Sequence, residues 1–186
     1  MSTLIVLFLG AALAIYLVTL FNRLVKSRQL AEEGWSGIDV QLKRRADLVP
    51  SLVETVKGYA GHERALFDEI VLLRTQVGRL AESDVAGRGQ LEGALSDALT
   101  KLMALAEAYP DLKASGNFRD LQAALAEVED EIQMARRYYN GATRNVNVLV
   151  ESFPSNLVAQ AFGFRHRDYF EIGDADRAVP EVALER

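Results

Sequence analysis

The sequence predicts an all-α fold: an N-terminal transmembrane helix, then an elongated antiparallel bundle of three to four long helices with a short C-terminal helix. Three observations predict it. Residues 1–22 carry no charged side chain, apolar residues recur at spacings of three and four along most of the remaining chain, and only 4 of the 186 residues are proline. A bundle accounts for these spacings because each helix must bury one apolar stripe.

The residue types present exclude several classes of chemistry. The chain has no cysteine, which excludes a disulfide scaffold, an iron–sulfur cluster and a thiol nucleophile. It has two histidines, so a metal site built from several histidines is not expected. The net charge of −5 argues against a nucleic-acid partner bound through counterion release. We therefore expect no metal, no cofactor and no nucleic acid.

Residues 1–22 form the predicted membrane anchor. Their apolar run is long enough to cross most of a bilayer core of about 30 Å as a helix. A cleaved signal peptide is the competing interpretation, but such a signal begins with basic residues, and here the basic residues follow the run. Basic flanks stay in the cytoplasm, which predicts the N-terminus outside and residues 23–186 inside. The residues that carry this prediction are Leu4, Phe8, Leu13, Leu17, Phe21, Arg23, Lys26 and Arg28.

Two long helices are predicted between Leu24 and Leu80. The first follows one apolar stripe and has no clear break from the anchor. Pro50 is expected to end it, because proline lacks the amide hydrogen and disfavours helical geometry at the preceding residue. Ser51 and Glu54 then form a capping box for the second helix.

Two more helices are predicted in the second half of the chain. Two glycines place a loop at residues 82–89, and a third helix follows and ends at Pro110. Asn117 starts the fourth helix, whose apolar stripe continues without a miss to Phe153, over about 36 residues. The predicted divisions are an anchor at 1–22, a helical bundle at 23–172 and a disordered tail at 173–186.

No motif for catalysis is found in the sequence. There is no phosphate-binding glycine loop, and the Glu-x-x-His pairs that a di-iron bundle needs are missing. His62 and Glu63 are adjacent, so on a helix their side chains point about 100° apart and cannot form a zinc site of the H-E-x-x-H type. We therefore predict that the protein is not an enzyme, and we assign no catalytic residue.

Two sets of polar residues interrupt the apolar stripes and are candidate interaction sites. Glu63 occupies a core position of the second predicted helix, next to His62 and just after two glycines. It marks either a satisfied polar contact at a kink or a weak point where a partner helix approaches. A second set lies beside the core stripe of the fourth helix. It is either a solvated or salt-bridged face or a hydrogen-bonded seam that fixes register between subunits or helices. Its residues are Arg137, Asn140, Arg144 and Asn147.

A basic triplet, Lys43, Arg44 and Arg45, has the composition of a lipid-binding patch. In a helix it lies about 30 Å beyond residue 23, which is too far from a lipid surface for an effective attraction. It also falls near a predicted helix C-terminus, where cations are favoured. We interpret the triplet as structural.

An aromatic and basic segment follows the fourth predicted helix. If successive helices alternate in direction, residue 153 returns to the membrane face, where aromatic and basic side chains suit the headgroup layer. Alternatively, the aromatic side chains cap the open end of the bundle core. The candidate membrane-interface residues are Phe153, Phe162, Phe164, Arg165, Arg167, Tyr169 and Phe170.

Several runs of this sequence resemble the LemA family, in the expected order between about residues 20 and 170. They are WSGIDVQLKRR at 35–45, DLVP at 47–50, LVETVKGYA at 52–60, AEAYPDLKA at 106–114, ARRYYN at 135–140 and ESFPSN at 151–156. The resemblance implies a bacterial protein of the cytoplasmic membrane, with its N-terminus outside and an antiparallel helical bundle in the cytoplasm. It implies no catalytic residue, because the family has no established biochemical activity.

The functional hypothesis is a membrane-anchored structural or interaction protein without catalytic activity, either a self-assembling scaffold or a membrane-stress component. The alternative is an adaptor or regulator of an integral-membrane protease or a stress-response partner. The expected partners are membrane lipid, further copies of the chain and an integral-membrane protein.

Overall fold

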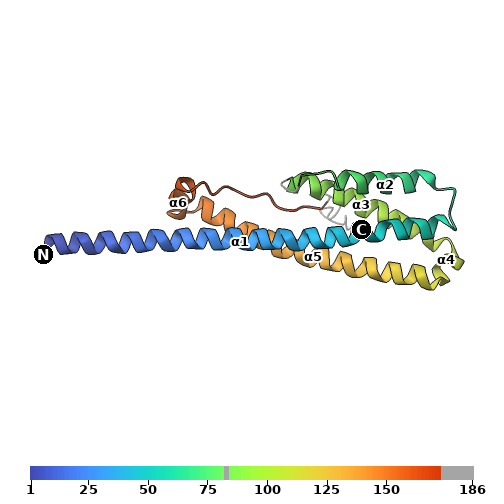
Figure 1. Cartoon of the computed structure of the whole chain (residues 1–186), viewed down its shortest axis with the longest axis horizontal. Helices are drawn as coiled ribbons and strands as arrows, with labels where there is room; N and C mark the ends of the chain where they lie inside the picture. Colours follow the sequence, from blue (N-terminus) through green and yellow to red (C-terminus); the bar gives the residue numbers. More distant parts are fainter. Residues whose placement is uncertain (82–83, 173–186) are drawn as a thin grey trace, which may run out of the picture. The chain divides into compact units, whose positions relative to one another are not determined.

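The computed structural model describes residues 1–81 and 84–172, and every regular element in these ranges is a helix, which confirms the all-α prediction. The predicted tail at 173–186 lies outside the described residues. The chain divides into two compact units, and the division falls within its two longest helices. Unit 1 comprises residues 1–45 and 126–169, and unit 2 comprises residues 46–125 with the described residues from 170 onward. The helices are α1 (Ser2–Lys57), α2 (Arg64–Val77), α3 (Val85–Glu107), α4 (Pro110–Ala114), α5 (Gly116–Glu151) and α6 (Ser155–Ala161) (Figure 1).

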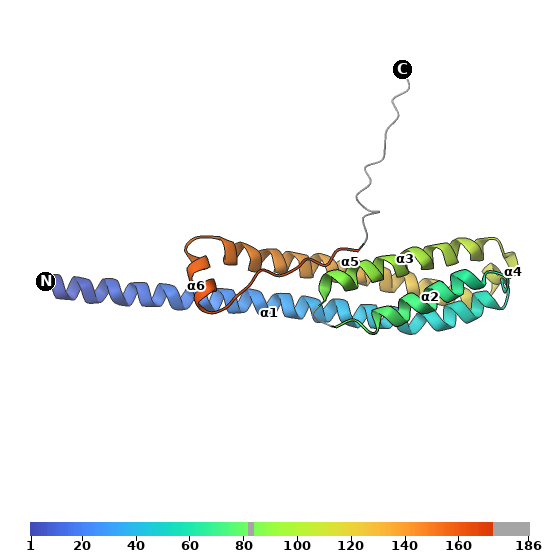
Figure 2. The same ribbon diagram turned by 90° about the horizontal axis from the view of Figure 1, so that it is seen from above.

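Unit 1 pairs the first part of α1 with the second part of α5 in antiparallel order. Arg44 lies 3.0 Å from Glu127, whereas Leu24, twenty residues earlier, shares a buried cluster with Leu149. The two helices approach closely at Gly34, where a Cβ atom would meet the Cα of Tyr139 at 3.0 Å. The short helix α6 lies beside α1 (Figure 2). The buried clusters that hold unit 1 together contain Leu24, Ala31, Ala142, Val146, Leu149, Val158 and Ala159.

Unit 2 is built from α2, α3 and α4 together with the end of α1 and the start of α5. Helices α2 and α3 run side by side (Figure 2). One apolar core joins all of these helices, and its buried residues follow the stripes predicted from the sequence. Among them are Leu52, Val56, Ile70, Leu95, Leu102, Leu112 and Phe118.

The expected helix break at Pro50 is wrong, because α1 continues through this residue to Lys57. Proline has no amide hydrogen, so the carbonyl oxygen of Ala46, four residues earlier, has no helical donor. The Nε of Arg74 in α2 donates to that oxygen at 2.8 Å. A side chain from another helix of unit 2 thus replaces the missing backbone bond. The capping box at Ser51 and Glu54 is also wrong, because both residues lie inside α1.

The real break between the first two helices lies a few residues later. Helix α1 ends at Lys57, and α2 begins at Arg64 after a turn that contains two glycines. The amide of Ala60 donates to the carbonyl of Val56 at 2.9 Å and satisfies the end of α1. Glycine gains the most backbone entropy outside a helix, which favours the break at this position.

The predicted loop at residues 82–89 is largely helical, and Glu82 and Ser83 lie outside the described residues. Helix α3 begins at Val85, because Asp84 caps it by accepting a hydrogen bond from the amide of Gly87 at 2.9 Å. The predicted end of α3 before Pro110 is confirmed, since α3 ends at Glu107. The fourth predicted helix is also confirmed: α5 has 36 residues.

Candidate functional site

The first part of α1 is apolar and exposed in unit 1. In the described residues, α1 is the single helix long and apolar enough to cross a membrane, with a mean hydropathy of 2.7 in its most apolar stretch. Leu4 is 68% exposed, Phe8 73% and Leu13 59%. Exposure of so many adjacent apolar side chains is costly in water and favourable in a bilayer. This segment coincides with the predicted anchor.

An apolar groove lies where the exposed segment of α1 meets α6. It has a volume of about 500 Å³ and is lined by Leu17, Val18 and Phe21 of α1 and by Leu157, Val158, Ala161 and Phe162. Phe162 is 64% exposed, and its ring centroid lies 4.8 Å from that of Phe21. The groove therefore makes the apolar surface of α1 continuous with that of α6.

The predicted membrane-interface residues fall into different environments. Phe153 is 80% exposed, and Arg165 and Tyr169 are also exposed. Phe164 is half-buried, lies against Phe21 at 5.9 Å and joins the cluster at this end of unit 1, as the capping alternative predicted. Phe170 is fully buried in unit 2, so its assignment to the membrane interface is wrong.

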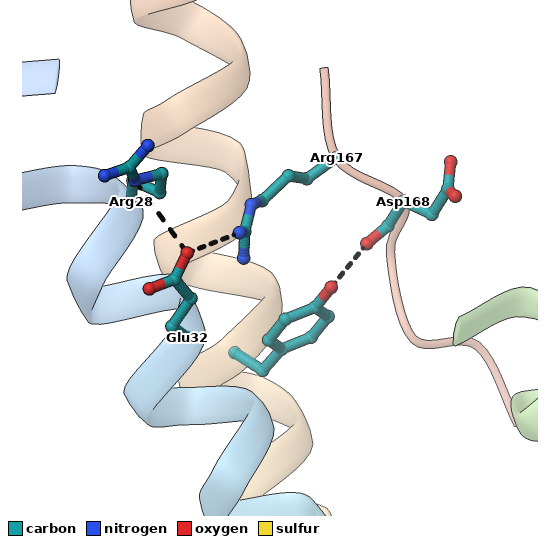
Figure 3. A network of polar contacts seen from close by, with 5 residues as sticks. Arg28, Glu32, Arg167 and Asp168 are labelled. Carbon is teal, nitrogen blue, oxygen red and sulfur yellow. Dashed lines mark hydrogen bonds and ion pairs between the residues drawn. The ribbon is translucent and has the colours of Figure 1, made fainter. Parts of the chain in front are cut away.

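An extended strap, residues 163–169, crosses unit 1 and is held by polar contacts. Asn147 binds the backbone of Arg167 twice: its Oδ1 accepts from the amide at 2.9 Å, and its Nδ2 donates to the carbonyl at 3.0 Å. The hydroxyl of Tyr139 donates to the carbonyl of Asp168 at 2.8 Å (Figure 3). Burial raises the pKa of Tyr139, so the phenol keeps the proton that this bond requires.

Charged side chains attach the same strap to α1. The guanidinium of Arg167 donates to Glu32 at 2.8 Å, and Arg28 lies 3.8 Å from the same carboxylate (Figure 3). Arg28 also lies 5.3 Å from the centre of the Phe164 ring. The sequence offered a signal for part of this network, because Arg28 and Glu32 are four residues apart on one helix. It offered none for the pairing with Arg167.

The polar stripe of the fourth predicted helix is not one continuous seam. Asn147 is buried and binds the strap inside unit 1, so neither a solvated face nor a seam between subunits describes it. Arg137 and Arg144 are exposed, and Asn140 is partly buried. The hydrogen-bonded alternative therefore applies to Asn147, with the strap as its partner.

His62 and Glu63 do not occupy the core of a helix. Both are exposed in the turn before α2, and Glu63 is the residue that precedes its first turn. The core position expected for Glu63 came from extending one apolar stripe across a turn, and this prediction is wrong. Both residues are accessible, and nothing in the described structure brings them to the other predicted site residues.

Two residues of the basic triplet have the structural role that was predicted, and Lys43 is exposed. Arg44 pairs with Glu127 at 3.0 Å, and the fully buried Arg45 pairs with Glu129 at 2.8 Å. Both carboxylates come from α5, so these pairs fix its register against α1 in unit 1. The sequence did not predict the burial of Arg45, because a charged residue is rarely buried without a partner and the partner is 84 residues away.

In the parts of the chain that the structure describes, no group of three or more His, Asp, Glu or Cys side chains is placed to hold a metal ion. The polar side chains of Arg45, Arg167 and Asn147 instead form ion pairs and hydrogen bonds that join α1, α5 and the strap. These observations define an all-α protein with one long apolar N-terminal helix and with polar networks that serve helix packing.

The family profile of LemA matches residues 34–184, and the chain belongs to the LemA family. It is similar to the magnetosome protein MamQ 2 of Paramagnetospirillum magneticum, with 25% identity over 89% of this chain and 71% of the relative. It is similar to the magnetosome protein MamQ of Magnetospirillum gryphiswaldense, with 24% identity over the same shares. The protein LemA of Metamycoplasma hominis is 24% identical over 84% of this chain and 71% of its own length.

Proposed function

We propose that this LemA-family protein is a single-pass protein of the bacterial cytoplasmic membrane that acts through contacts with other proteins and has no catalytic activity. The observation that carries the proposal is the exposed, charge-free start of α1, which coincides with the one candidate membrane span of the described residues. The family and the names of the relatives support a membrane-associated protein, and these names do not indicate a catalytic activity.

The proposal places the N-terminus outside and the helical units in the cytoplasm. It is supported by Arg23, Lys26 and Arg28, which follow the apolar segment, because basic residues next to a span stay inside. The chain has no cysteine, so a single cysteine added after Arg186 gives a clean test. A membrane-impermeant maleimide should label it after lysis and leave it unlabelled in intact cells. Labelling in intact cells would reverse the orientation.

The proposed activity is self-assembly into a membrane scaffold. It is supported by apolar side chains that stay exposed beyond the anchor, among them Met134 and Tyr138, which are 47% and 48% exposed and lie one turn apart on α5. The test is the mass of the full-length protein extracted gently from its membrane. A large, narrowly distributed homo-oligomer that Met134→Glu disperses supports the scaffold, while Gln122→Glu serves as the exposed control on the same helix.

A monomer or dimer at native concentration would contradict the scaffold. If that species carried a stoichiometric membrane protein of another kind, the role would be that of an adaptor. The two outcomes are separated by identifying every polypeptide in the extracted species and measuring its stoichiometry.

A further inference from the structure

A hollow lined by both polar and apolar side chains opens between α1 and α5 on unit 1, immediately after the charge-free segment of α1. It has a volume of about 360 Å³, which is within the range of sites for small ligands. Its α1 residues are spaced three and four apart and therefore share one face, and the same holds for its α5 residues. Its lining includes Arg23, Lys26, Ser27 and Leu30 of α1 and Asn145 and Leu149 of α5.

No carboxylate among the described residues neutralises the positive charge of this hollow. Arg23 and Lys26 are exposed, and no carboxylate of the described chain forms an ion pair with either of them. The next arginine, Arg28, pairs with Glu32, as Arg44 does with Glu127. None of the residues that line the hollow is acidic. Two cations side by side without a counter-charge favour an anionic ligand.

The other lining groups suit a phosphodiester. The guanidinium of Arg23 and the ammonium of Lys26 are the usual donors to phosphate oxygens. The hydroxyl of Ser27 and the amide of Asn145 add neutral donors from the two facing helices. Leu30 and Leu149 supply apolar walls, which suit a ligand that is only partly polar.

We propose that this hollow binds the phosphate headgroup of one anionic phospholipid of the surrounding bilayer. The proposal rests on the membrane anchor proposed above, because that anchor decides where the hollow lies. Arg23 is the first charged residue of the chain, and the hollow's α1 residues end about 10 Å further along the helix, at about 1.5 Å per residue. The polar layer of a bilayer lies within this distance of the hydrocarbon core. A phospholipid is therefore present at the hollow at high local concentration, unlike a soluble phosphate.

The test uses the full-length protein in nanodiscs of phosphatidylcholine that contain a minority of phosphatidylglycerol. Native mass spectrometry counts the lipids that remain bound when the protein is released from the disc. We expect one retained phosphatidylglycerol. Arg23→Gln and Lys26→Gln should each lower its retention about fivefold, the effect of one lost cation at a membrane surface.

Two matched variants separate a defined site from a general attraction by charge. Asn145→Leu changes no charge and fills the hollow, so it should also lower the retention of phosphatidylglycerol about fivefold. Because Asn145 is exposed, the fold tolerates this change. Arg144→Gln removes one exposed cation of α5 outside the hollow, so retention should not change. Full retention by Asn145→Leu, or an equal loss with Arg144→Gln, would overturn the proposal.

Two further measurements distinguish a failure of the proposed headgroup site from a failure of the proposed membrane anchor. Resistance of the membrane-bound protein to alkaline extraction tests the anchor alone, and loss of the protein under this treatment would overturn both proposals. Resistance without selectivity for phosphatidylglycerol would overturn the headgroup site alone. Displacement of the retained phosphatidylglycerol by millimolar inorganic phosphate would assign the site to a soluble phosphate and contradict the lipid.

Discussion

The passage of α1 through Pro50 depends on one side chain of α2. The Nε of Arg74 supplies the carbonyl of Ala46 with the donor that Pro50 lacks. Arg74→Met keeps a long, unbranched side chain of similar helix propensity and removes the donor. We expect this change to destabilise unit 2 in the natural chain and to have little effect once Pro50→Ala has restored the amide hydrogen.

The magnitude follows from the geometry of the bond. A hydrogen bond from a charged donor contributes about 1.5–3 kcal/mol, and the partial burial of Arg74 favours the lower end of this range. In the Pro50→Ala chain the carbonyl of Ala46 has a helical donor, so Arg74→Met should cost only a few tenths of a kcal/mol through lost packing of the side-chain stem. The double-mutant coupling should therefore be about 1–1.5 kcal/mol.

The assay is hydrogen exchange of peptides that cover residues 44–54, measured on the full-length protein in mild detergent. A local loss of about 1.5 kcal/mol accelerates exchange by roughly tenfold, and Pro50→Ala should abolish this acceleration. Arg79→Met, an exposed arginine just beyond α2, is the control and should show no coupling. An equal acceleration by Arg74→Met with and without Pro50 would refute the reasoning.

Three further predictions concern contacts within the units. Asn147→Leu removes both bonds to the Arg167 backbone, so strap amides should exchange roughly tenfold faster or more; unchanged exchange would contradict the anchoring role. Tyr139→Phe should cost about 1 kcal/mol in urea unfolding at pH 8. The deficit should disappear as pH rises through the raised folded-state pKa of Tyr139, because the wild-type phenol then loses its proton; a deficit constant to pH 12 would refute this. Gly89→Ala adds a Cβ that overlaps the carbonyl oxygen of Glu171, so urea unfolding should show a loss of about 1–3 kcal/mol, whereas Gly37→Ala, with open space around it, should show none.

Periodicity predicted those parts of the fold whose causes are local. The length of α5 could be predicted because its apolar stripe continues along most of its 36 residues. The predicted break before α2 was misplaced because its position depends on a residue that is distant in sequence. Pro50 is normally a strong helix terminator, and the donor that overrides it, Arg74, lies 28 residues away in sequence. A rule that considers four or five neighbours cannot include such a compensation.

In the candidate site, the sequence likewise predicted the type of residue but not the group that the residue contacts. The sequence identified Asn147 as part of a polar stripe beside the core of its helix, but it did not identify the strap backbone that Asn147 binds. A buried polar residue with a full set of internal partners is explained by folding alone. Polar groups that lie together without a partner among the described residues are therefore the ones that indicate an external ligand. In unit 1 that condition is met by Arg23 and Lys26, which the sequence marked only as the positive flank of the anchor.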